Sequence, residues 1–185
     1  HPLVAFDGLN GDFLKAKLRS GNQYTSKGVK DFLEPLLKHY EAALPVTDIL
    51  VRGDSGFATP DIYELCEEHN QHFVIRLKNN KKLYRAAEEF VYYDNNHPWD
   101  EKEVYYHSIP YQAGSWSKQR RVCIRSTREV GELIFNHSFI VTSFSDNISP
   151  ERVFETYNKR GTMENYIKEA KNSFFFDKTD SSGFL

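Results

Sequence analysis

The sequence is 185 residues long, and 39% of these residues are hydrophobic and 27% charged. That balance supports a core and excludes a chain that is disordered throughout, so we expect one compact domain, or one domain with an inserted sub-domain. The formal net charge of −2 excludes a nucleic-acid binder that is basic throughout. The two cysteines lack CxxC spacing and no apolar run is long enough to span a membrane, which favours a protein of the reducing cytosol.

Apolar runs bounded by turn residues predict alternating strands and helices in the first half of the chain. In chain order, we expect strands at 3–6 and 12–19, a helix from Thr25 or Ser26 to about 40, a strand at 49–51, a helix at 60–70 and a strand at 73–77. Pro35 favours a kink or a late start in the first helix. The later strand, helix and strand predict a parallel crossover in an α/β sheet.

The pattern changes after residue 78. Aromatic and β-branched residues alternate with polar ones in 103–111 and 120–126, which predicts an antiparallel β-rich insertion over 79–136. An apolar run at 139–144 predicts a strand that returns to the main sheet. Ser149-Pro150-Glu151 then begins a final helix with a cap, a proline and an acid. We therefore divide the chain into a core, 1–78 and 137–185, and an insertion, 79–136.

Two short runs are basic although the whole chain is not. They contain no acid, and such local patches can bind phosphate. Their cations are Arg76, Lys78, Lys81, Lys82 and Arg85 in the first run, and Lys118, Arg120, Arg121, Arg125 and Arg128 in the second. We expect the first run either to line a DNA path or to be the solvated flank of a strand end.

Asp54 follows a predicted buried strand, in the turn Gly53-Asp54-Ser55-Gly56. Open α/β sheets bind their ligands at the carboxyl ends of strands, so this acid is a candidate site residue. The alternative is an aspartate whose side chain only caps a tight turn.

Four polar residues near the C-terminus share one face of the predicted final helix. Tyr157, Arg160, Glu164 and Lys171 are separated by three, four and seven residues. At about 100° per residue, these offsets place all four within an arc of roughly 60°. A carboxylate between two cations and a phenol suits catalysis beside a phosphate backbone. Together with Asp54, Glu164 would supply the hard oxygen ligands that Mg²⁺ or Mn²⁺ prefers.

These residues resemble a known family. The segment Arg52-Gly-Asp54-Ser-Gly-Phe57, followed by Tyr157-x2-Arg160-x3-Glu164-x6-Lys171, is similar to the DDE transposases of bacterial insertion sequences, in the group with a Tyr-Arg-Glu-Lys signature. The segment from His1 to Gly8 resembles the second core strand of that group. The resemblance spans nearly the whole chain, from His1 to about Asp180.

The resemblance implies an RNase H-like α/β fold, a mixed sheet with flanking helices and an inserted antiparallel β-rich sub-domain. It implies that Asp54 and Glu164 are catalytic acids that bind Mg²⁺ or Mn²⁺. Tyr157, Arg160 and Lys171 would contact phosphates of the transposon end. The implied partners are double-stranded DNA with terminal inverted repeats, target DNA and a second subunit in a homodimeric synaptic complex. The implied location is the bacterial cytoplasm, in association with the nucleoid and not with a membrane.

The family pattern places its first catalytic Asp on a strand before the one predicted at 3–6. We therefore expect this chain to be a fragment of a longer transposase, which binds metal weakly and does not catalyse strand transfer alone. Asp7 is the only acid near a strand end in the N-terminal region. It is either a metal ligand or, as we favour, part of a turn with Gly8.

Trp116 lies among serines and cations in what looks like an exposed turn. In related transposases an aromatic residue of the insertion stacks on a flipped base, and aromatic rings beside cations suit splayed single-stranded DNA. The alternative is an indole that packs on the sheet of the insertion.

Three other functions remain possible from the sequence. One is an RNase H-like nuclease that cuts DNA without strand transfer, and another is a catalytically dead remnant that only binds DNA. The third is a structural α/β domain in which the polar stripe is a coincidence. An acid on the preceding strand, terminal repeats around the gene and charge reversal at Arg160 or Lys171 would separate them.

Overall fold

The structure is a computed structural model that describes residues 2–20, 23–93 and 100–159. Its helices and strands follow the predicted alternation closely. In chain order they are β1 Leu3–Phe6, β2 Phe13–Lys17, α1 Val29–Ala43, β3 Leu50–Gly53, the 3₁₀ helix η1 Ser55–Phe57, α2 Pro60–Glu68, β4 His72–Leu77, α3 Lys81–Glu88, β5 Glu103–Tyr111, β6 Arg120–Arg128, β7 Asn136–Thr142 and α4 Pro150–Asn158.

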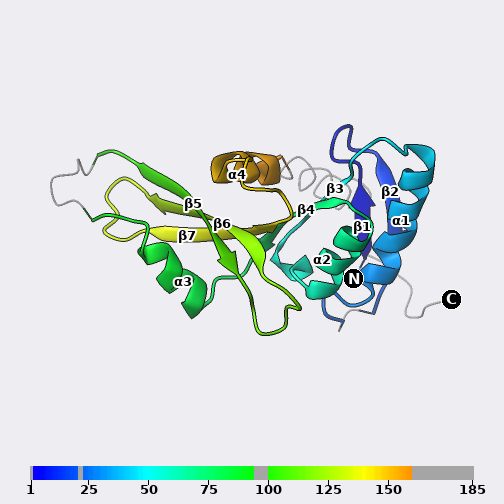
Figure 1. Cartoon of the computed structure of the whole chain (residues 1–185), viewed down its shortest axis with the longest axis horizontal. Helices are drawn as coiled ribbons and strands as arrows, with labels where there is room; N and C mark the ends of the chain where they lie inside the picture. Colours follow the sequence, from blue (N-terminus) through cyan, green and yellow to red (C-terminus); the bar gives the residue numbers. More distant parts are fainter. Residues whose placement is uncertain (1, 21–22, 94–99, 160–185) are drawn as a thin grey trace, which may run out of the picture.

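A five-stranded mixed sheet organises the fold, in the order β3-β4-β7-β6-β5. β3 and β4 are parallel, with Leu50 opposite His72, which confirms the predicted crossover through α2. β7 returns antiparallel to β4, as predicted, and the β5–β6 hairpin extends the same sheet beyond β7. β1 and β2 form a separate antiparallel pair beside α1 (Figure 1). The expected class, a mixed α/β sheet with flanking helices, is confirmed.

Alternate residues of β4 belong to two different cores on the two faces of the sheet. Phe73 and Ile75 pack in a core that includes residues of α2 and α3. Val74 packs in a second core with Val153 and Phe154 of α4. Helix α4 therefore covers one face, and α2 and α3 cover the other (Figure 1). This period of two is what a strand that is buried on both faces requires.

Helix α1 begins later than the cap at Thr25 or Ser26 predicts. Two successive turns precede it, and Gly28 then adopts the left-handed conformation with φ 71°. A backbone in this region cannot belong to a right-handed helix, so the helix begins only at Val29. Pro35 lies inside the helix and not at its start, so the late start that we attributed to this proline is instead set by Gly28.

Helix α3 is absent from the sequence prediction, which assigned 79–136 to β structure. Asn80 caps it, and its Oδ1 accepts the backbone N–H of Leu83 at 3.0 Å. Leu83 and Ala87, four residues apart, are its buried side. The spacing of those two residues behind an Asn cap was the signal available in the sequence.

The two cysteines are free thiols in the sheet core, and both side chains are fully buried. Burial raises the pKa of Cys66 to about 12 and that of Cys123 to about 11. Among the described helices, none is both long and apolar enough to cross a membrane.

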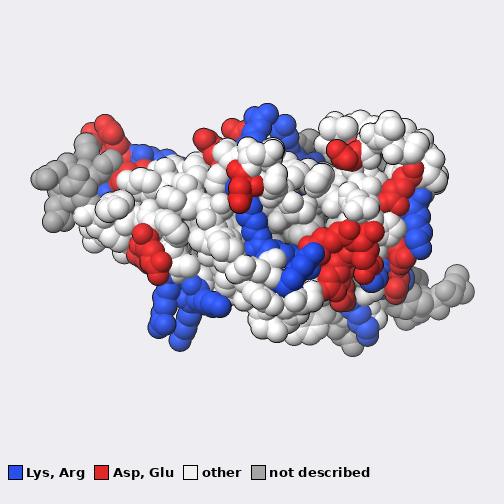
Figure 2. Space-filling model, viewed as in Figure 1, with Lys and Arg blue, Asp and Glu red and all other residues white. Residues whose placement is uncertain are grey.

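Charge is unevenly divided on the face that carries α2 and α3. Acidic side chains gather over α2, and a basic group lies over α3 with an acidic group beside it (Figure 2). The acids of α2 are Asp61, Glu64, Glu67 and Glu68, and the cations of α3 are Lys81, Lys82 and Arg85.

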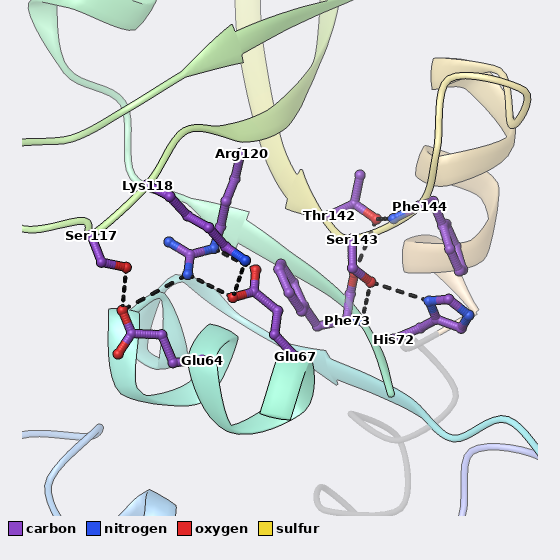
Figure 3. Close-up of polar contacts among 10 residues, drawn as sticks. All are labelled: Glu64, Glu67, His72, Phe73, Ser117, Lys118, Arg120, Thr142, Ser143 and Phe144. Carbon is purple, nitrogen blue, oxygen red and sulfur yellow. Dashed lines mark hydrogen bonds and ion pairs between the residues drawn. The ribbon is translucent and has the colours of Figure 1, made fainter. Parts of the chain in front are cut away.

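Arg120, at the start of β6, joins the hairpin to α2. Its guanidinium donates two hydrogen bonds to Glu67, at 2.8 and 2.9 Å, and its side chain is nearly completely buried (Figure 3). The same guanidinium lies over the rings of Tyr63, at 5.2 Å, and Trp116, at 5.7 Å. Burial raises the pKa of the Glu67 carboxyl, but hydrogen bonds from Arg120 and Lys118 outweigh the burial and lower that pKa overall.

The start of β4 is held to the end of β7 by side-chain hydrogen bonds as well as by the backbone hydrogen bonds of the sheet. Ser143 Oγ accepts the backbone N–H of Phe73 at 3.0 Å and lies 3.3 Å from His72 Nδ1 (Figure 3). Thr142 Oγ1 donates to the Phe73 carbonyl at 3.0 Å. These contacts fix the register between the parallel and the antiparallel parts of the sheet.

We expect Arg120→Ala to destabilise the protein by about 3 kcal/mol, because it leaves the partly buried Glu67 carboxylate with only Lys118 and removes two cation–π contacts. The free energy of unfolding, measured by urea denaturation, checks this expectation. The matched control is Arg152→Ala, which breaks the exposed ion pair with Glu155 and should cost no more than about 0.5 kcal/mol. Equal losses for the two variants would contradict a stabilising role for the Arg120 contacts.

Candidate active site

Asp54 directly follows β3, at the carboxyl end of the sheet's parallel pair. It is the N-cap of η1, and its Oδ1 accepts the backbone N–H of Gly56 at 2.8 Å. The capping role weighed from the sequence is therefore present. The carboxylate accepts this hydrogen bond through Oδ1, one of its two oxygens.

Gly56 has a steric reason to be glycine. A Cβ at this position would lie 2.9 Å from Thr25 Cγ2 and 3.0 Å from Asp54 Oδ1. A larger residue would therefore press on the carboxylate that the turn holds in place. The segment Gly-Asp-Ser-Gly thus fixes the position of the Asp54 side chain.

Arg52, two residues before Asp54, joins three distant segments at this strand end. Its Nη1 donates to the Thr156 carbonyl in α4 at 3.2 Å, across 104 residues of sequence. Its Nη2 donates to the Gly8 carbonyl in the β1–β2 turn at 3.4 Å. The end of β3, the end of α4 and the turn after β1 are therefore neighbours. We did not single out Arg52 from the sequence, because no local pattern reveals partners so far along the chain.

Asp7 has the turn role that we favoured. Its Oδ1 accepts the backbone N–H of Leu9 at 2.7 Å, and its main chain exchanges hydrogen bonds with Gly11 and Asp12. Nothing in these contacts requires a metal.

Tyr157 lies in the last turn of α4 and is half-buried, next to the Thr156 carbonyl that Arg52 contacts. It packs against the core on this face and lines a small hollow of about 30 Å³ with Arg76 and Arg125. Arg125 also lies 5.1 Å from the centre of the Phe154 ring. Two arginines and a phenol thus meet beside the end of α4, a combination that suits a phosphate.

The other members of the predicted stripe, Arg160, Glu164 and Lys171, lie outside the described residues. Helix α4 ends at Asn158, so the described part of the helix carries only Tyr157. In the described ranges, no group of three or more His, Cys, Asp and Glu residues is placed to hold a metal ion. Of the two predicted metal ligands, the described chain therefore contains Asp54 alone.

Trp116 is not exposed, contrary to the expectation from its polar neighbours. Only 7% of it is accessible, and its ring makes edge contacts with Tyr63 and Tyr111 at 5.4 and 5.5 Å between ring centres. The indole packs between the hairpin and α2, which agrees with the packing alternative. A role in base stacking would require the ring to leave these contacts.

The first basic run is divided between the two faces of the sheet. Arg76, on β4, lies in the hollow on the α4 face with Tyr157. Lys81, Lys82 and Arg85 belong to α3, which packs on the opposite face. A single continuous path along all five cations is therefore excluded.

Comparison with solved structures finds a match to a structure of the piggyBac transposase, a synaptic complex with hairpin DNA. The identity is 13% and the TM-score 0.46, over 86% of this chain and 31% of that one, so the chain spans about a third of that protein's length. No curated protein matches significantly. The family described as transposase DDE domain group 1 matches residues 1–185. The predicted relationship to DDE transposases is thereby confirmed, and the chain belongs to the DDE transposase domain family.

Proposed function

We propose that this chain forms part of the catalytic domain of a DNA transposase. The enzyme hydrolyses phosphodiester bonds at the ends of a mobile element and joins the freed 3′-hydroxyl groups to target DNA. The observation that carries the proposal is the double contact of Arg52. It brings the end of β3, which bears Asp54, beside the end of α4, which bears Tyr157 and precedes Glu164 in the sequence.

The donor chemistry of Asp54 fits a hard divalent cation, Mg²⁺ or Mn²⁺. Asp54 and Glu164 would hold the metal together with a further acid, and Asp54 is the described member of that set. When bound, such a cation stabilises charge on the oxygens of a phosphodiester undergoing displacement. The contribution of the chain is a carboxylate fixed at a strand end by the Gly56 N–H.

DNA is the partner that the family relationship supports. Tyr157, Arg160 and Lys171 are our proposed phosphate contacts at the transposon end, and Arg76 and Arg125 flank Tyr157 in its hollow. The DNA would be double-stranded, with terminal inverted repeats, and two subunits would hold two ends in a synaptic complex. An origin in a bacterial insertion sequence, with action in the cytoplasm at the nucleoid, belongs to the same proposal.

The domain division belongs to this proposal too. Residues 1–78 and 137–185 form the catalytic core, and 79–136 form an insertion whose strands β5 and β6 extend the core sheet through β7. Through the shared sheet, a shift of the insertion would then also move β3 and β4, the strand pair that carries Asp54.

We expect Asp54→Asn, in the protein expressed from its complete gene, to lower cleavage of a labelled transposon end by about a hundredfold or more. Asparagine still accepts the Gly56 N–H, so the turn and the fold should remain, while the ligand charge is lost. Cleavage and joining are measured separately on gels, with Mg²⁺ and with Mn²⁺. The control is Asp48→Asn, an exposed acid before the other end of β3.

Normal cleavage by Asp54→Asn would overturn the proposed role of this acid. Cleavage without any joining by the wild-type protein would favour the nuclease alternative. DNA binding with neither reaction would favour the remnant that only binds DNA.

We expect Arg52→Lys to lower end cleavage by about a hundredfold while DNA affinity stays close to the wild-type value. Lysine keeps the charge, but an ammonium cannot span the Gly8 and Thr156 carbonyls as a guanidinium fork does, so the ends of β3 and α4 would shift relative to each other. Cleavage rate and affinity are measured on the same labelled DNA.

The control is Arg121→Lys, which alters a guanidinium that also joins main-chain carbonyls, those of Ser145 and Ile148 before α4. A similar fall in cleavage for this variant would show that the Arg52 contacts have no special importance.

A further inference from the structure

We propose that α3 carries a second DNA-binding surface, which contacts the sugar–phosphate backbone on the face of the sheet opposite Tyr157. This α3 surface consists of Lys81, Lys82 and Arg85. The inference rests on the proposed function, because it assumes that the substrate is DNA, and it assigns a contact beyond the predicted stripe.

The cations of the α3 surface are exposed and make no ion pair with the described residues. Three other exposed lysines are neutralised: Lys38, Lys102 and Lys118 lie 2.7, 2.6 and 3.0 Å from a carboxylate, whereas exposed Lys17 and Lys27 make no ion pair with the described residues. A chain with a net charge of −2 has acids available for such pairs. The uncompensated charge of α3 therefore remains available to an external anion.

Lys81 and Lys82 occupy the first turn of α3, where the helix dipole disfavours positive charge. The first turns of α1, α2 and α4 each contain an acid, Asp31, Asp61 and Glu151, whereas that of α3 contains none. The arrangement thus costs stability locally. An anion bound over this turn would be favoured both by the side chains and by the dipole.

Two separate hollows, which share Tyr111, lie between the turn after Asp54 and the α3 surface. Ser55, next to Asp54, lines a cavity of about 220 Å³ together with Asn80, at the cap of α3, and Tyr111. Tyr111 also lines a second, open hollow of about 580 Å³ that includes Lys82. The Lys82 ammonium lies 5.3 Å from the centre of the Tyr111 ring. We infer that DNA held at Asp54 continues to α3 along these two hollows, which we call the track.

The charges on this side of the molecule favour a DNA path that runs towards α3 and away from α2. The acids over α2 repel a phosphate backbone, and the cations over α3 attract it (Figure 2). From Lys81 to Arg85 the helix rises about 6 Å, and each DNA strand carries a phosphate every ~3.4 Å of axis. The α3 side chains are thus spaced to contact neighbouring phosphates. Such contacts carry no sequence preference.

The test uses the triple variant Lys81→Gln, Lys82→Gln, Arg85→Gln and a fluorescent 30-base-pair duplex of arbitrary sequence, with binding measured by anisotropy at several salt concentrations. The same assay compares the double variant Lys81→Gln, Lys82→Gln with a charge-matched control, Lys17→Gln, Lys27→Gln, whose two lysines are exposed and make no ion pair with the described residues. We expect the triple variant to lose at least about tenfold in affinity and the slope of log K against log salt to fall by about 2 to 3.

Glutamine is a good helix former, and the removal of lysines from the first turn relieves an unfavourable interaction with the dipole. The melting temperature of both α3 variants should therefore equal or exceed that of the wild type, so a loss of affinity would not reflect unfolding. If the wild type binds DNA and the double variant matches the control in affinity and slope, the α3 surface is overturned while the proposed function stands. If the wild type shows no salt-dependent DNA binding, the proposed function itself fails.

Discussion

The arrangement of the candidate site depends on the guanidinium of Arg52. It ties the end of β3 to α4 and to the turn after β1, three segments that the backbone ladder of the main sheet does not hold together. A single flat fork can satisfy two carbonyls at once, which fixes direction as well as distance. The Arg52 side chain lies between the supports of the Asp54 carboxylate and the Tyr157 phenol, and it adds to the packing of α4 on the sheet.

The sheet separates two surfaces with different electrostatic character. On the α4 face, Arg76 and Arg125 lie beside Tyr157 in a small hollow. On the other face, acids lie over α2 and cations over α3, and Arg120 and Lys118 of the β5–β6 hairpin bind Glu67 of α2. The net charge of the chain is thus nearly neutral, but its local charges create fields strong enough to orient a polyanion. The hairpin that carries Arg120 is held rigidly to α2, so the two surfaces keep their positions relative to the sheet.

Most strands and the parallel crossover were predictable, because apolar runs between Gly and Pro residues are local signals. The family relationship was predictable from the Asp54 turn and the spacing after Tyr157. Helix α3 was not, since its apolar side consists of only Leu83 and Ala87. The burial of Trp116 depends on Tyr63 of α2, and the role of Arg52 on a carbonyl 104 residues away. Such contacts belong to tertiary structure, and no window of sequence contains both partners.

The two buried thiols provide a way to measure how the folded protein opens. Cys66 and Cys123 lie on opposite faces of the sheet, in the α2 and the α4 core, and neither reaches solvent in the folded state. Alkylating reagents attack the thiolate, which burial suppresses at neutral pH. The alkylation rate of each cysteine therefore measures the opening of its own core, the α2 core for Cys66 and the α4 core for Cys123. A difference between the two rates would identify which core opens first.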